Sequence, residues 1–258
     1  MSERWIELDG AANVRDLGGL PTRDGGVTRY GRALRADNLQ GLTRGDIDLL
    51  VGTFSVGDVV DLRTTSEVDA EGPGPLVGYD GVRIHHHSLL PEAGRRTDVE
   101  AADNVLPTTL PTDSGTWDLT GLYYTRYLSR RPDSVLAALR TLGSSDGGTI
   151  IHCAAGKDRT GVICAMALSV IGVERDAIVD DYVATGERLE AVIGRLRSTP
   201  TYAADLDGSS IDEHVPRPEA MHTFLRYLDT ECTGPLGWLE RHGWTSADTD
   251  ALHARLLA

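Results

Sequence analysis

A cysteine and an arginine six positions apart, Cys153 and Arg159, are the residues whose types and spacing best suit joint chemistry. A short apolar stretch precedes the cysteine and a long apolar run follows the arginine, which predicts a strand, a loop and a buried helix. A loop that enters a helix N-terminus points free amides at one spot, where the helix dipole adds positive charge. Gly156 lets the backbone curl, and the guanidinium matches two phosphate oxygens. The segment therefore predicts a site for a phosphate dianion.

The positive charge of the helix-end amides and the guanidinium also acts on the thiol of Cys153. A cysteine among helix-end amides and a guanidinium can have a pKa of about 3.5–7.5, so a thiolate is expected at neutral pH. The thiolate attacks phosphorus and gives a cysteinyl-phosphate, which water hydrolyses while amides and Arg159 hold the oxygens. His152 is expected to help fix the loop, and Thr160 to bond the sulfur. The expected phosphate-binding residues are His152, Ala154, Ala155, Gly156, Lys157, Thr160 and Gly161.

Chance alone could place a buried cysteine six residues before a surface arginine. The full string is much harder to obtain by chance, because it has His before the cysteine, Gly inside the loop and Thr-Gly after the arginine. The change from strand to helix at the loop adds to this specificity. We therefore interpret the segment as a catalytic loop.

The elements that must position this loop follow from hydrophobic patterns and caps. Strands mixed with crossover helices predict an α/β domain with a central, mostly parallel sheet flanked by helices. Strands are predicted at 32–35, 56–62, 82–86 and 149–152. Helices are predicted at 43–51, 64–68, 119–128, 132–142, 162–171, 176–197, 221–228, 236–241 and 250–257.

The whole chain, 1–258, is expected to form one domain. Residues 91–118, with three prolines, predict a long loop that either serves the site or is a surface insertion. Residues 174–200 are expected to form a helical lid that shields the thiolate, or helices that simply pack on the core. Residues 198–218 are interpreted as a polar linker.

Composition narrows the partners. The net charge of −14 argues against nucleic-acid binding, and no polybasic cluster could hold the chain on a membrane. Three cysteines make neither a disulfide framework nor a zinc motif, so no cofactor and no metal is expected. The first residues lack a signal-peptide pattern, which favours the cytoplasm, although export without a signal would leave no such mark. Oligomeric state cannot be predicted.

The loop resembles the signature of the protein tyrosine phosphatase superfamily, His-Cys-x5-Arg-Ser/Thr. Its Gly-Lys-Asp-Arg form is similar to the bacterial triple-specificity phosphatases, described as acting on phosphotyrosine, phosphoserine/threonine and phosphoinositides. Residues 13–19 and 61–67 resemble further motifs of that group, so the similarity runs from about 10 to about 185. The resemblance implies a protein tyrosine phosphatase-like fold with a helical lid or C-terminal helical extension.

The resemblance also implies a general acid. The sequence has no Trp-Pro-Asp string, and Trp117-Asp118 is its nearest match. In the similar subfamily the Asp before the signature Arg is the proposed acid, which is Asp158 here. Asp61, at the end of a predicted strand, is the other candidate, or else it pairs with Arg63.

Six further residues are ambiguous. Lys157 either contacts extra phosphates on the substrate or is a solvated charge. Arg35 and Arg63 either face the pocket or form structural ion pairs. The three histidines 85–87 are expected at the site rim or in a structural role, because no other ligands accompany them.

The leading hypothesis is a phosphatase that hydrolyses phosphate monoesters of phosphotyrosine proteins, phosphoinositides or both. Its substrate would thus be a phosphorylated protein, lipid or small molecule. A small-metabolite phosphatase acting on nucleotides or inositol phosphates is the alternative within this class. A phospho-ligand binding module without catalysis is the alternative outside it, and a rhodanese-type sulfur transferase fits the loop least well.

Overall fold

The computed structural model describes residues 4–72, 74–91 and 116–258. Within them a five-stranded sheet has the order β1-β2-β5-β3-β4. The strands are β1 Arg15–Asp16, β2 Ala33–Ala36, β3 Val56–Asp61, β4 Arg83–His86 and β5 Gly148–His152. Only β1 runs antiparallel to its neighbour in this sheet, and the three other pairings are parallel. The predicted mostly parallel α/β fold is confirmed.

The centre of the sheet fixes where the catalytic loop begins. Strand β5 is buried along its whole length, and its last residue, His152, pairs with Ala36 of β2 and Asp61 of β3. The carboxyl ends of three parallel strands therefore meet at one edge. The loop that follows β5 starts at this edge, where sites in open α/β sheets gather.

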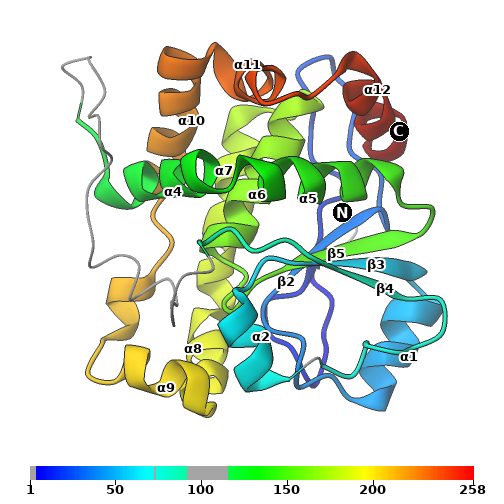
Figure 1. The fold of residues 1–258 in the computed structure, drawn as a ribbon, viewed down its shortest axis with the longest axis vertical. Coiled ribbons are helices and arrows are strands. Elements are labelled where there is room, and N and C mark those ends of the chain that lie inside the picture. Colours follow the sequence, from blue (N-terminus) through cyan, green and yellow to red (C-terminus); the bar gives the residue numbers. More distant parts are fainter. Residues whose placement is uncertain (1–3, 73, 92–115) are drawn as a thin grey trace.

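Alternating side chains give the sheet two apolar faces. Val60 and Ile151 lie in a large core cluster with α4 Leu119–Arg130, α5 Pro132–Ser144 and α6 Asp158–Val170, and with the C-terminal helices. Val59 and Ile150 lie in a second cluster with α1 Arg44–Gly52 and the N-terminal segment. Figure 1 shows α5, α6 and α12 above the sheet and α1 below it.

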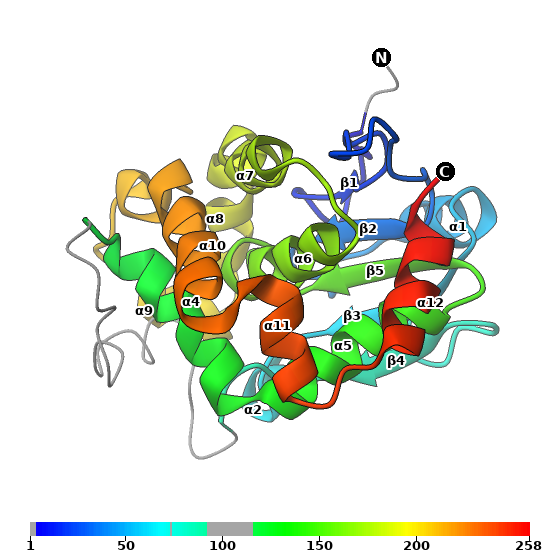
Figure 2. The same ribbon diagram turned by 90° about the horizontal axis from the view of Figure 1, so that it is seen from above.

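Caps start two of the helices where the sequence predicts them. Thr43 and Thr64 each accept a bond from the third residue of their helix, whose carboxylate bonds back to the cap. These boxes begin α1 and α2 Thr65–Glu71. The C-terminal helices α10 Pro218–Cys232, α11 Gly234–Arg241 and α12 Ser246–Leu256 complete the large core. Figure 2 shows α10 beside α4 and α12 beside α5.

The region 175–214 folds as five short helices. They are α7 Arg175–Ala184, η1 Thr185–Arg188, α8 Leu189–Arg197, α9 Pro200–Leu206 and η2 Ile211–His214. Helix α7 packs in the large core, whereas α8 and α9 form a third apolar cluster with Ala154 of the catalytic loop. We call residues 189–214 the cap.

The interpretation of 198–218 as a polar linker is wrong. This stretch contains α9 and η2, because Tyr202 and Leu206 bury against α8 and the loop rather than facing solvent. Strand β1 is not predicted, and the helical range 176–197 holds α7, η1 and α8, whereas the other predicted helices and strands lie within a few residues of their ranges. The predicted loop at 91–118 lies, apart from its ends, outside the described residues. In the described ranges no helix is long and apolar enough to cross a membrane.

Candidate active site

The loop between β5 and α6 has the form that the sequence predicts. Cys153 follows β5 directly and is 1% exposed, and α6 begins at Asp158. Gly156 has a φ of 67°, which favours glycine, and a Cβ there would meet the carbonyl oxygen of Ala36 at 2.4 Å. The loop thus packs backbone to backbone against β2, and the glycine is required twice over.

A buried polar network holds the loop from beneath. Asn13 Nδ2 donates to the carbonyls of Ala155 at 3.0 Å and Gly156 at 3.3 Å, and Arg35 Nη2 donates to the latter at 2.7 Å. In a trans peptide the N–H points opposite to the C=O. Fixing these carbonyls inward therefore turns the next amides of the loop toward the phosphate side.

A fully buried carboxylate anchors this network. Asp181 of α7 accepts from Arg35 Nη1 at 2.6 Å and Arg15 Nε at 3.2 Å, and pairs with Arg4. Burial opposes its ionisation, but the charges of Arg15, Arg35 and Arg4 hold its pKa well below the usual range. Arg15 in turn donates to Asn13 Oδ1. We call Asn13, the three arginines and Asp181 the base network.

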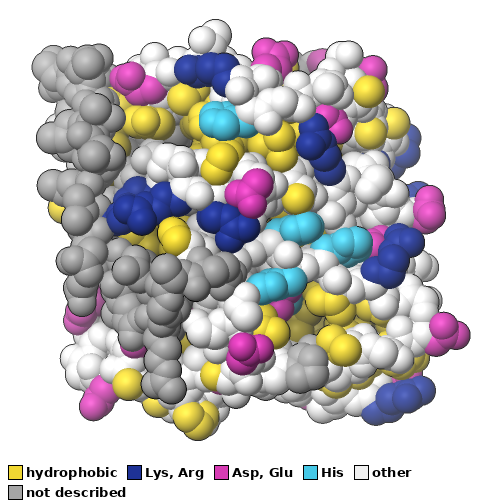
Figure 3. Space-filling view, in the orientation of Figure 1, with side chains coloured by type: hydrophobic (Ala, Val, Ile, Leu, Met, Phe, Trp, Pro, Cys, Tyr) yellow, Lys and Arg dark blue, Asp and Glu magenta, His cyan; other side chains and the backbone are white. Residues whose placement is uncertain are grey.

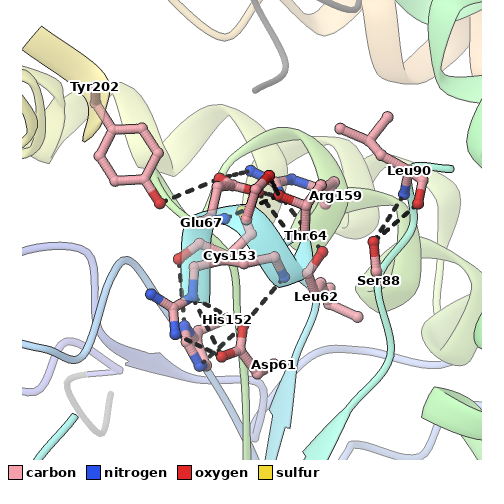
Figure 4. Close-up of polar contacts among 12 residues, drawn as sticks. Asp61, Leu62, Thr64, Glu67, Ser88, Leu90, His152, Cys153, Arg159 and Tyr202 are labelled. Carbon is pink, nitrogen blue, oxygen red and sulfur yellow. Dashed lines mark hydrogen bonds and ion pairs between the residues drawn. The ribbon is translucent and has the colours of Figure 1, made fainter. Parts of the chain in front are cut away.

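The signature arginine is docked on a second carboxylate. Arg159 donates from Nη1 to Glu67 Oε2 at 2.7 Å, from Nη2 to Oε1 at 2.9 Å, and to the carbonyl of Leu62. Burial opposes the ionisation of Glu67, but the charge and hydrogen bonds of Arg159 lower its pKa. Tyr202 of the cap donates to Glu67 Oε1 at 3.1 Å, as Figure 4 shows. This bidentate pair fixes the plane of the guanidinium.

His152 supports the loop as a neutral side chain. Burial lowers its pKa to about 4. Its Nδ1 lies 3.2 Å from the carbonyl of Cys153, and its Nε2 lies 3.6 Å from Asp61 Oδ1. Thr160 is fully buried, but its Oγ1 has no hydrogen-bond partner in the described part of the chain. The expected bond from this hydroxyl to the sulfur is therefore absent from the structure.

The two candidate acids have different surroundings. Asp158 lines the pocket over the loop, and its Oδ1 accepts from Tyr124 at 2.5 Å. Asp61 is gripped by Arg63, which donates from Nε, Nη2 and its backbone amide. Burial opposes the ionisation of Asp61, but the hydrogen bonds and charge of Arg63 hold its pKa well below the usual range. Asp118 caps α4 instead, accepting from Gly121 at 2.9 Å.

A pocket of about 540 Å³ lies between the loop and the cap. Its walls combine polar loop groups with apolar cap side chains, and Lys157 reaches across to donate to the carbonyl of His214 at 2.9 Å. The lining residues are Glu67, Ala154, Ala155, Lys157, Asp158, Arg159, Leu189, Ile193, Leu196, Tyr202, Asp205, Leu206 and His214. Apolar walls with a few polar groups are typical of ligand-binding pockets.

The three histidines 85–87 do not line this pocket. Histidine side chains gather near β4 on the face shown in Figure 3. His85 bonds Asp58 at 2.7 Å, and His86 bonds the carbonyl of Arg63 at 2.7 Å. Within the described ranges no group of three or more His, Cys, Asp or Glu side chains could hold a metal.

A model of the tyrosine phosphatase family matches residues 6–258. The chain belongs to this family. Membership of this family accounts for both the fold and the catalytic loop. The chain is therefore a phosphatase-type hydrolase whose substrates carry phosphate. The resemblance read from the loop motif is confirmed.

Named relatives agree with this family. The triple specificity protein phosphatase PtpB of Mycobacterium tuberculosis is 29% identical, over 74% of this chain and 72% of its own. A putative tyrosine-protein phosphatase of Cupriavidus necator is 29% identical over 71% of this chain and 63% of its own. A tyrosine-protein phosphatase of Nostoc commune is 30% identical over 61% of this chain and 49% of its own. This chain thus spans about half to three quarters of these relatives.

Solved structures are more distant. TpbA of P. aeruginosa in complex with pTyr is 16% identical, covers 86% of this chain and 97% of its own, and has a TM-score of 0.37. A second TpbA structure is 18% identical over 75% of this chain and 89% of its own, with a TM-score of 0.36. These scores are too low to support an argument, so the fold rests on the sheet described above.

Glu67 and Tyr202 are site residues that the sequence did not reveal. The sequence places Glu67 in the 61–67 motif and in a short predicted helix, but it does not reveal that Glu67 binds Arg159. Asn13 and Arg35 are named by the sequence, one in a motif and one as an ambiguous charge, but their contact with the loop is not. The only signal in the sequence was that polar residues lie close to a predicted helix cap.

Proposed function

We propose that this chain hydrolyses phosphate monoesters through a cysteinyl-phosphate on Cys153, with phosphotyrosine proteins, phosphoinositides or both as substrates. The observation that carries the proposal is the loop itself. Its cysteine is buried at the start of a helix, its carbonyls are tied inward by the base network, and its arginine is held by Glu67. The name of the Mycobacterium relative supports a range that includes more than one phosphoamino acid.

The reaction has two steps. In the first, the Cys153 thiolate forms a bond to phosphorus while the bond from phosphorus to the leaving oxygen breaks, and Asp158 gives that oxygen its proton. In the second, a water attacks phosphorus, Asp158 takes the water's proton, and the sulfur leaves as thiolate. Loop amides and Arg159 hold the three other oxygens throughout, in positions fixed before substrate arrives.

Asp158 is the better candidate for the acid. It lines the pocket and is 19% exposed, so a leaving group can reach it. Asp61 is held in the ionised state by Arg63, and a carboxylate held ionised has no proton to give. We assign Asp61 to the support of Arg63 and His152.

The cap bears on substrate choice. Its apolar side chains face the loop across the pocket, which suits the ring of a phosphotyrosine or another apolar group next to phosphate. With the cap in this position a folded protein surface would not reach Cys153, so we propose that the cap opens for such substrates. Lys157 is placed to meet a second negative group, once it leaves the carbonyl of His214.

Nucleotides and inositol phosphates remain the alternative substrates, because they carry the same phosphate monoester group. A cytoplasmic location and a single domain over 1–258 stay predictions. Neither changes the chemistry proposed for the loop.

The test is phosphate release with chelator present, by wild type and Cys153→Ser. The panel contains a phosphotyrosine peptide, a phosphoserine peptide, phosphoinositides, inositol phosphates and nucleoside monophosphates. We expect release from the phosphotyrosine peptide or the phosphoinositides, and none with Cys153→Ser. Substantial activity in Cys153→Ser would contradict the thiolate mechanism. Binding of phosphopeptide without turnover by wild type would favour a binding module instead.

A further inference from the structure

Two buried tyrosines lead from the core to the carboxyl group of Asp158. Tyr124 of α4 is fully buried and its hydroxyl lies 2.5 Å from Asp158 Oδ1. Tyr182 of α7 is 2% exposed, and its hydroxyl lies 2.7 Å from that of Tyr124. The ring of Tyr124 meets those of Tyr182 and Phe224 edge to face. The reaction steps proposed above use neither tyrosine.

The direction of this chain of hydroxyls follows from counting hydrogens. Each phenol has one O–H to donate. Tyr124 donates its only hydroxyl hydrogen to Asp158, so Tyr182 must be the donor in the bond between the two tyrosines. Burial, followed by the charge of Asp158, raises the pKa of Tyr124 well above its usual value, and burial also raises that of Tyr182. Both phenols therefore stay protonated and act as donors, and successive donors polarise one another.

The two oxygens of Asp158 thus become different. Oδ1 accepts from Tyr124, and the ammonium of Lys157 lies 3.7 Å from the same atom. Oδ2 has no recorded hydrogen bond to any residue that the structure describes. A carboxyl group turns easily about its last torsion, which has two broad minima, so without a fixed partner its oxygens would exchange. A bond at Oδ1 alone stops this exchange.

We propose that Tyr124 is a positioning residue that fixes Asp158 so that Oδ2 carries the catalytic proton. In the first step Oδ2 gives its proton to the leaving oxygen, and in the second it takes the proton of the attacking water. Tyr182 supports Tyr124 through the bond between the two hydroxyls. This inference rests on the proposed role of Asp158 as the acid.

Purely structural tyrosines would behave differently. If the pair served only to pack α4 and α7 onto α6, its hydroxyls would matter for stability alone. Replacing Tyr124 by Phe keeps the ring and its aromatic contacts and removes only the oxygen. A structural role predicts equal changes on every substrate, whereas a positioning role depends on how much the leaving group needs a proton.

The experiment compares kcat/KM for p-nitrophenyl phosphate, whose leaving group needs little protonation, with that for an alkyl phosphate. We expect Tyr124→Phe to lower the alkyl value by about tenfold, a fraction of what general acid catalysis contributes, and the aryl value by less than about twofold. Tyr182→Phe should show the same selectivity with a smaller loss. Thr125→Val removes a neighbouring buried hydroxyl, which bonds only its own helix at Leu122, and should change neither value.

A double-mutant cycle separates the inference from its premise. In an Asp158→Asn background, Tyr124→Phe should cause no further loss, because a residue acting through Asp158 has nothing left to position. Equal losses on both substrates for Tyr124→Phe, or the same loss in the Asp158→Asn background, would overturn the positioning role. Equal losses for Asp158→Asn itself would overturn the premise. A selective Asp158→Asn with an unselective Tyr124→Phe would overturn the inference alone.

Discussion

Below the catalytic loop the packing is polar and fully buried, whereas above it the packing is largely apolar and encloses the pocket. The base network ties loop carbonyls to Asn13 and Arg35, and behind them Asp181 holds the arginines. The cap contacts the same loop through aliphatic side chains and through a few polar bonds, such as Tyr202 to Glu67. Hydrogen bonds fix direction and apolar contacts do not. We therefore expect the base network to set the shape of the loop, and the cap to shift without altering that shape.

The largest expected effect comes from the centre of the base network. Asp181→Asn keeps the side-chain shape but leaves buried guanidiniums without their counter-charge, which should lower the free energy of unfolding by about 3 kcal/mol. Denaturant titration measures this. Asp229→Asn is the matched control, because Asp229 pairs with Arg175 where both are more than 40% exposed. It should cost less than about 1 kcal/mol.

Wild type and Asp181→Asn can also be compared across pH. Since the pKa of Asp181 is lowered in the folded state, its stabilising contribution is complete above the unfolded value of about 4 and is lost as pH falls through the folded value. Wild type should therefore lose stability more steeply than Asp181→Asn below about pH 4. Parallel curves would show that the carboxylate does not carry the network.

A smaller but more local effect is expected where the base network meets the loop. Asn13→Ala removes the donors to the carbonyls of Ala155 and Gly156, so the loop amides lose their fixed direction. We expect kcat/KM to fall by about 10- to 100-fold, and inhibition by inorganic phosphate to weaken with it. Thr185→Val removes a hydroxyl of the same region that accepts from Arg15 and from Asn13 but does not bond the loop carbonyls. If both variants lost activity equally, the carbonyl bonds would not be the cause.

The smallest effect is expected in the cap. Leu196→Ala removes apolar contact from the cluster over the loop, so the cap should open more often without global unfolding. Inactivation of Cys153 by peroxide should become faster by roughly threefold to tenfold. Tyr202→Phe should change this rate less, because it keeps the ring packed in the cluster and removes one hydrogen bond to the Glu67 carboxylate, which Arg159 still pairs. Leu236→Ala, in α11, is the control. A rate unchanged in Leu196→Ala would show that the cap does not shield the thiolate.

Local signals predict the catalytic loop and the elements beside it. The apolar run after Arg159, the glycine inside the loop and the caps Thr43 and Thr64 act over a few residues, and the structure has each where the sequence places it. Residues 198–218 fail for the opposite reason. Helix α9 forms because Tyr202 and Leu206 find partners far away in sequence, on α8 and on the loop.

The base network could not be predicted from the sequence either, because its partners lie far apart along the chain. Asp181 is 146 positions from Arg35 and 166 from Arg15, so no spacing rule connects them. A charged residue in an amphipathic stretch is usually solvated, and its burial becomes visible only in the fold. The sequence therefore names the groups that do chemistry better than the groups that hold them.

The positive charge of the base network has a consequence for how phosphate reaches the loop. The chain carries a net charge of −14, so a phosphate dianion approaching from solvent meets a repulsive exterior before it meets the guanidiniums beneath the loop. Salt screens exposed charges over about 8 Å at physiological strength, but it screens buried ones far less. Added salt therefore weakens the repulsion outside more than the attraction inside, so dissolved ions favour the entry of the dianion more than they oppose its binding.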